Sequence, residues 1–107
     1  MISRRSTPID FSRIASAAQP YLPVLCARWL PGGRREGSEW VCRNPTRTDR
    51  RAGSFKINLQ SGRWADFATG DRGGDAVSLA AYLHGRSQFD AAVELSRMLG
   101  LPDGDLT

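Results

Sequence analysis

Two short runs of alternating apolar and polar residues, separated by a glycine-containing turn, restrict this chain to folds that contain a β-hairpin. In residues 54–59 every second residue is apolar, which is the period of a strand with one buried face. Residues 60–62 supply the turn, and residues 63–67 form the second run. By the same alternation, Trp64 and Asp66 share one face of the second strand. We therefore expect an antiparallel pair at the centre of the fold.

Helical periodicity precedes the hairpin. Pro8 and Asp10 form a helix-start signal, and Pro20 interrupts the apolar pattern that follows. This predicts two helical pieces with a bend between them. Residues 34–38 are expected to form an exposed turn that leads into a strand over residues 39–43, and the polar segment 44–53 is expected to be a surface loop.

Two further helices follow the hairpin. A glycine-rich turn leads into an apolar helix over residues 75–84 that ends at Gly85. The last helix begins at Ser87, where Ser87 and Asp90 form an approximate capping box, and it stops at Gly100. Its expected core stripe is Phe89, Ala92, Val93, Leu95, Met98 and Leu99.

The length of 107 residues allows one domain. We expect an α+β fold, a small antiparallel β-sheet packed against flanking α-helices, over residues 9–101. Residues 1–8 and 102–107 are expected to be a flexible N-terminus and a flexible tail. No apolar run approaches the length of a membrane helix and no secretory signal is visible, so we expect a soluble, cytoplasmic protein without a membrane partner.

The positive charge is concentrated near the hairpin. From Arg43 to Arg63 there are six cationic residues and a single acid, Asp49, a local balance of +5 against +4 for the whole chain. Nearly all the cations are arginine, which suits bidentate and stacking contacts with phosphates or bases. A nucleic acid is the first partner to consider, although a solvated surface of an arginine-rich protein gives the same count.

Aromatic residues interleaved with arginine are the basis of single-strand binding, because bases stack on rings while guanidinium groups follow the phosphates. Trp64 is left open between this role and the core, whereas Phe55 and Phe67 are expected in the core. The glycine turn around Arg72 could hold a further phosphate or only permit close packing. The residues predicted to bind nucleic acid are Arg43, Arg47, Arg50, Arg51, Lys56, Arg63, Trp64 and Arg72.

No catalytic residue, cofactor or metal is predicted. Cys26 and Cys42 lack the paired spacing of zinc ligands and are expected to be buried, inert thiols, and His84 is expected to be solvated at a helix end. Asp71 and Asp75 flank the glycine turn, where helix capping explains them better than a divalent metal does. Enzymatic activity by this chain alone is therefore not expected.

The order of a helix, EWVCRNP, a polar loop, GSFKINLQSGRWADF, a glycine turn and GGDAVSLAAYL resembles the N-terminal zinc-binding domain of bacterial and phage DNA primases. Cys42 falls where that family has the first Cys of its Cys-Pro-x-His pair. Phe67 and Gly70 stand where it has its Cys-x2-Cys pair. The resemblance thus implies a zinc ribbon without zinc. Four aromatic residues would offset the missing metal by packing: Trp40, Phe55, Trp64 and Phe67.

Metal-free domains of this kind resemble the front modules of primase-helicases on plasmids, prophages and integrated elements. The resemblance implies a single-stranded-DNA-binding module of a mobile-element primase or replication system, non-catalytic by itself, whose partners are single-stranded DNA and a primase, polymerase or helicase. The alternative is a free-standing phage or plasmid protein that inhibits or recruits a host protein complex, for example an anti-defence inhibitor. A nucleotidyl transferase is a third possibility, but it needs a metal site that the sequence does not supply.

Overall fold

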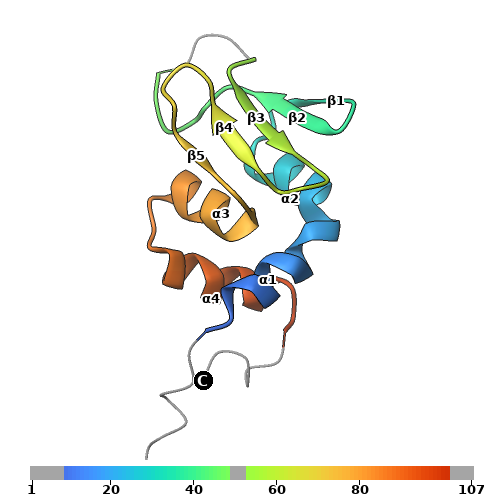
Figure 1. Cartoon of the computed structure of the whole chain (residues 1–107), viewed down its shortest axis with the longest axis vertical. Helices are drawn as coiled ribbons and strands as arrows, with labels where there is room; N and C mark the ends of the chain where they lie inside the picture. The colour runs from blue at the N-terminus through green and yellow to red at the C-terminus, as the bar shows by residue number, and fades with distance from the viewer. Residues whose placement is uncertain (1–8, 49–52, 102–107) are drawn as a thin grey trace, which may run out of the picture.

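A computed structural model describes residues 9–48 and 53–101, which form a five-stranded antiparallel sheet with helices on one side of it (Figure 1). In order along the chain, the strands are β1 (Arg34–Glu36), β2 (Glu39–Cys42), β3 (Phe55–Asn58), β4 (Trp64–Asp66) and β5 (Arg72–Gly73). Their order in the sheet is the same, so every strand pairs with its sequence neighbour. The predicted α+β class is confirmed. The predictions for residues 1–8 and 102–107 lie outside the described residues.

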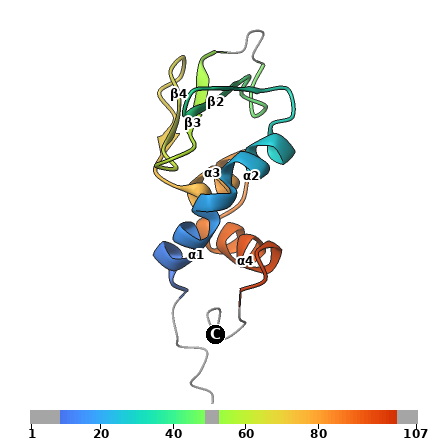
Figure 2. The ribbon, with the colours of Figure 1, turned by 90° about the vertical axis from the view of Figure 1, so that its right-hand side faces the viewer.

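The N-terminal helices bend where the sequence indicated. α1 (Phe11–Ala18) begins at Asp10, whose carboxylate accepts a hydrogen bond from the backbone N–H of Arg13 at 3.0 Å. A short 3-10 turn (Gln19–Tyr21), with Pro20 near its start, separates α1 from α2 (Leu22–Trp29). The proline cannot donate to a continuous helix, so the chain turns here and α2 runs beneath the sheet (Figure 2).

The predicted central hairpin is present. Phe55 pairs with Asp66 and Ile57 with Trp64, and burial alternates along both strands. Asp66 and Trp64 thus share the inner face.

Two strands are additions to the predicted sheet. Residues 34–38 were expected to be a turn, but Arg34–Glu36 forms strand β1. Its three residues are all exposed, so no apolar alternation marked it. β5 consists of two residues of the glycine-rich segment, paired with β4. β1 and β5 lie at the two edges of the sheet, and each is a strand because it pairs with β2 or β4, not because its local sequence favours one.

Capping defines both C-terminal helices. α3 (Ala76–His84) has a capping box between Asp75 and Ser78 and ends at Gly85, whose φ of 63° is left-handed. α4 (Gln88–Met98) begins at Ser87 as predicted. Its expected core stripe is only partly right: Phe89 is 56% exposed and Met98 is 48% exposed.

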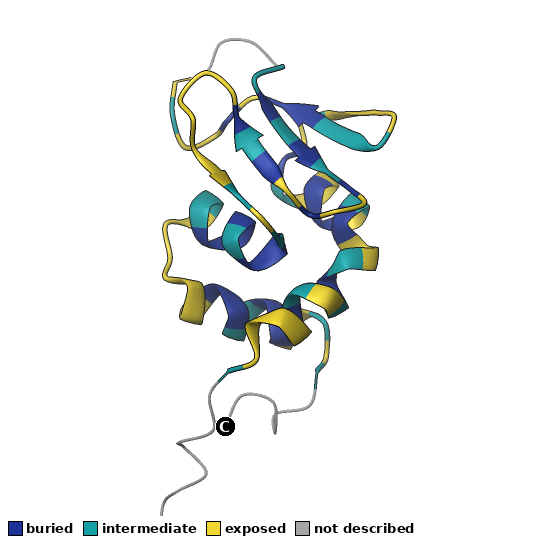
Figure 3. Ribbon diagram, in the orientation of Figure 1, coloured by how far each residue is buried: buried dark blue, intermediate teal, exposed yellow. Residues whose placement is uncertain are grey.

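The core lies between the inner face of the sheet and the helices (Figure 3). α3 packs on α4, and α1 contacts both of them. Cys26 and Cys42 are both buried, as expected, and outside any disulfide; burial raises the pKa of Cys26 to about 12, with the neighbouring Cys42 adding to the shift. None of the described helices has both the length and the apolar character needed to cross a bilayer. The largest fully buried side chains of the core include Phe55, Ile14, Leu22, Ile57, Leu79 and Leu95.

Candidate nucleic-acid interface

The outer face of the sheet carries a row of three residues across three strands. Lys56 of β3 pairs with Ala65 of β4, and Ala65 pairs with Arg72 of β5. Because paired residues point to the same face of a sheet, the two cations flank a small alanine. The row therefore forms a shallow depression with positive charge on both sides.

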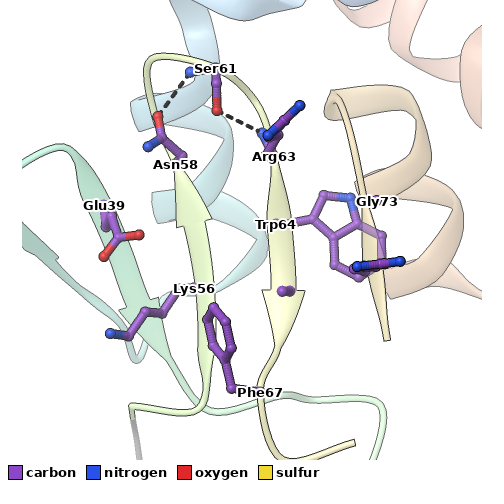
Figure 4. Close-up of a pocket in the computed structure, with 10 residues that line it drawn as sticks. Glu39, Lys56, Asn58, Ser61, Arg63, Trp64, Phe67 and Gly73 are labelled. Carbon is purple, nitrogen blue, oxygen red and sulfur yellow. Dashed lines mark hydrogen bonds between the residues drawn. The ribbon is translucent and has the colours of Figure 1, made fainter. Parts of the chain in front are cut away.

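This depression belongs to an open cavity of about 670 Å³, which we call the sheet-face cavity (Figure 4). Arg63, just before β4, adds a third cation to it, and Glu39 is the single acid among its lining residues. Within residues 9–48 and 53–101, none of the three cations takes part in an ion pair. The lining residues are Glu39, Lys56, Asn58, Ser61, Arg63, Trp64, Ala65, Phe67, Arg72 and Gly73.

Phe67 is an exposed aromatic residue at the edge of this cavity, which corrects its expected place in the core. The backbone N–H of Phe67 donates to the carbonyl of Ser54 at 2.8 Å, so pairing continues one residue beyond β4 and turns Phe67 to the outer face. Its side chain is 72% exposed. The ammonium nitrogen of Lys56 lies 5.9 Å from the centre of the phenyl ring, within the range of a cation–π contact.

Trp64 lies on the inner face, and the structure corrects its assignment as the base-stacking residue. The residue is 5% exposed. Its indole N–H donates to the hydroxyl of Ser78 at 3.0 Å, and its ring centroid lies 4.7 Å from that of Tyr82. The backbone of Gly73 covers the indole so closely that a Cβ there would lie 2.5 Å from two ring carbons. The ring therefore has no open face for a base.

Arg47 is also engaged inside the protein, which corrects its predicted role as a phosphate ligand. Its Nε donates to Oδ2 of the fully buried Asp66 at 2.7 Å. The hydrogen bond from Arg47 holds the pKa of Asp66 well below its usual range, helped by Asn44 and the N–H of Ala68 and opposed by burial. A guanidinium held in this way stays with its carboxylate rather than with a phosphate.

Asn44 anchors the loop that follows β2. It was expected on the surface but is 1% exposed, and its amide nitrogen lies 2.8 Å from both Oδ2 of Asp66 and the hydroxyl of Tyr82. The hydroxyl of Tyr82 in turn donates to Asp71 at 2.7 Å. Asp71 is therefore a hydrogen-bond acceptor for α3 rather than its cap, whereas Asp75 is the cap as predicted.

The structure brings together part of the predicted set. Lys56, Arg63 and Arg72 share the sheet-face cavity, while Arg43 is exposed and lines a different cavity. Arg50 and Arg51 lie outside the described residues. Phe67 is the functional candidate that sequence reasoning placed wrongly, and the alternation from Trp64 through Asp66 was the signal that pointed it outward.

A metal centre is not formed by the described part of the chain. No group of three or more His, Cys, Asp or Glu residues there could hold an ion. His84 is exposed at the end of α3, and its ring packs edge-on against Trp29 with centroids 5.5 Å apart. At the glycine turn, Gly73 allows the backbone to pack closely against Trp64. Binding of a phosphate at this turn stays a prediction.

Comparison with solved structures gives a match to the crystal structure of the Aquifex aeolicus primase (zinc binding and RNA polymerase domains). The TM-score is 0.72 at 22% sequence identity, and the match covers 87% of this chain and 22% of the other. The chain thus spans about a fifth of that protein, and the likeness shows a shared fold, as the resemblance implied. No family model matches the sequence, and comparison with curated proteins gives no match.

Proposed function

We propose that this chain binds single-stranded nucleic acid on the outer face of its sheet, as a non-catalytic module of a primase or replication system. The observation that carries the proposal is the row Lys56–Ala65–Arg72, with Arg63 and the exposed ring of Phe67 beside it on one open cavity. This surface therefore offers cations for the phosphates of a strand and an aromatic ring for one of its bases.

The three cations supply the phosphate contacts. Lys56, Arg63 and Arg72 line one cavity and form no ion pair with a described acid. Binding of a phosphate to each releases condensed counterions, which favours association at low salt. Two of the three are arginines, whose planar donors suit phosphate oxygens.

Phe67 supplies the stacking contact. Base stacking on an aromatic side chain contributes about 1–3 kcal/mol per base and is tolerant of sequence. The ring is 72% exposed and lies beside Lys56, so a stacked base keeps its phosphate close to a cation. Stacking requires an unpaired base, which is why the proposal specifies a single strand rather than a duplex.

The primase-like fold supports the assignment to DNA replication. The proposal extends that likeness to a single-stranded DNA template and to a primase, polymerase or helicase of a mobile element as protein partner. Synthesis of the primer would belong to a separate catalytic domain, so this chain is given no catalytic step.

Fluorescence anisotropy with a labelled single-stranded oligonucleotide at several salt concentrations tests the proposal. Three phosphate contacts predict a slope of about −2 for the logarithm of the affinity against the logarithm of salt concentration. A duplex of the same sequence serves as control and should bind more weakly. A flat salt dependence would contradict the proposal, and a host protein retained from a lysate after nuclease treatment would favour the inhibitor alternative.

A further inference from the structure

A second cavity, of about 370 Å³, lies beside the end of α2 and the start of the loop after β2. We call it the loop cavity. It shares no lining residue with the sheet-face cavity, and Cys42 in its wall is paired with Phe55 on the inner side of the sheet. The lining residues are Trp29, Leu30, Pro31, Gly32, Cys42, Arg43 and Pro45.

The walls are apolar and contain flat rings. Trp29 is half-buried at the end of α2, and the edge-on contact with His84 holds its indole from α3. Pro31 and Pro45 add two rigid rings. Arg43 is the single charged lining residue; it is exposed and forms no ion pair within the described part of the chain.

The wall next to the loop is held in place. Arg43 and Pro45 are the two neighbours of Asn44, whose side chain is buried and bonded to Asp66 and Tyr82. These two hydrogen bonds anchor the backbone between Arg43 and Pro45 to β4 and α3. Preorganised groups bind more tightly because less conformational entropy is lost on association.

We propose that the loop cavity binds a nucleobase that carries a phosphate, with the base against Trp29 and the phosphate on Arg43. A cavity of a few hundred Å³ with apolar walls and one oriented polar group is typical of small-ligand sites. A nucleotide consists of a flat base and a phosphate. The cavity offers rings on its wall for the base and the unpaired cation of Arg43 at its edge for the phosphate. The ligand is either a free nucleotide or one nucleotide of a strand. The site stands independently of the proposed function, because its residues are different.

NMR spectroscopy of the ¹⁵N-labelled full chain tests the site. The indole N–H signal of Trp29 is assigned by its loss in Trp29→Phe, and dAMP is then titrated to millimolar concentration. We expect the Trp29 signal to shift, and Arg43→Ala to weaken dAMP binding about tenfold through loss of a charged hydrogen bond. Arg97→Ala, which removes an exposed arginine of α4 that lines neither cavity, is the matched control and should leave dAMP binding unchanged.

Two further titrations define the ligand. Deoxyribose 5-phosphate lacks the base and should not shift the Trp29 signal; an equal shift would overturn the role of the base. A single-stranded oligonucleotide is added to the Lys56→Ala/Arg63→Ala variant, whose sheet-face cavity is weakened. A Trp29 shift with dAMP but not with the oligonucleotide identifies a free nucleotide as ligand, and a shift with the oligonucleotide identifies a nucleotide within a strand. No shift with either overturns the proposal and leaves the sheet-face proposal standing.

Discussion

Arg47 and Asp66 form an ion pair in which Nε of the arginine lies 2.7 Å from Oδ2 of a carboxylate with 0% exposure. The pair ties the loop after β2 to the end of β4. These are the two segments in which the primase resemblance places the two ligand pairs of a zinc site, at Cys42 and at Phe67. In this chain a charged hydrogen-bonded pair connects them.

Arg47→Ala should lower the free energy of unfolding by about 3 kcal/mol, because it leaves a buried carboxylate without its cation. Urea denaturation followed by tryptophan fluorescence measures this change. Arg43→Ala is the control, since Arg43 is exposed and should change stability by less than about 0.5 kcal/mol. Equal effects of the two substitutions would show that the Arg47–Asp66 pair contributes little to stability.

Stability should fall in acid through the same carboxylate. The folded-state pKa of Asp66 lies below its ordinary value of 3.8, chiefly because of the hydrogen bond from Arg47. On acidification the unfolded chain takes up the proton first. The stabilisation is therefore complete above about pH 5 and is lost progressively as the pH falls toward the folded-state pKa.

Asp66→Asn removes this titration, and its unfolding free energy should depend less steeply on pH below about pH 5 than that of the unchanged protein. Urea denaturation at a series of pH values compares the two. Parallel pH profiles would mean that Asp66 does not carry the acid sensitivity.

Phe67→Ala should weaken single-stranded oligonucleotide binding about tenfold, because one base loses its stacking partner. Stability should stay within about 0.5 kcal/mol, since the side chain is largely exposed. Phe89→Ala is the matched control: Phe89 is 56% exposed but lies on α4, away from the sheet-face cavity. Anisotropy titrations of the unchanged protein and of both variants measure the affinities. Equal affinities would remove Phe67 from the proposed interface.

Gly73→Ala should destabilise the fold by about 1–3 kcal/mol, the usual range for overpacking. The new Cβ would lie 2.5 Å from Trp64 ring carbons and from the hydroxyl oxygen of Ser78. The same change at Gly74 meets nothing within 4 Å and should be nearly neutral. Thermal unfolding of both variants measures the difference, which should vanish if β5 can move away from Trp64.

Zinc removal should leave the protein unchanged. The described residues provide no cluster of three metal-binding side chains, whereas a structural zinc ion needs four ligands. We expect the unfolding midpoint to be the same with and without EDTA, and elemental analysis of the purified protein to find no stoichiometric zinc. A lower midpoint in EDTA would show that a metal contributes to folding.

The elements that the sequence predicted correctly have local causes. The hairpin follows from strict alternation in residues 54–59, and the helix starts follow from the side chains of Asp10, Asp75 and Ser87, each of which accepts a hydrogen bond three residues along the chain. Such signals do not depend on distant partners. They were sufficient to give the fold class.

The errors concern residues whose environment is set by distant segments. Asn44 is buried because it bonds to Asp66 and Tyr82, which lie 22 and 38 residues further along the chain. Composition cannot reveal such distant partners. Phe67 is apolar, so hydrophobicity argued for the core, yet the strand register directs it outward. The proposed interface, a row across three strands, depends on the pairing of Arg72 in an edge strand that had no sequence signature.

The chain-ordered sheet also has a kinetic consequence. Every strand pairs with its neighbour in sequence, so the contacts that build the sheet are local and the entropic cost of closing its loops is small. The buried face of the sheet is completed only when the helices pack against it. Rapid refolding without long-lived intermediates is the behaviour that such a meander favours.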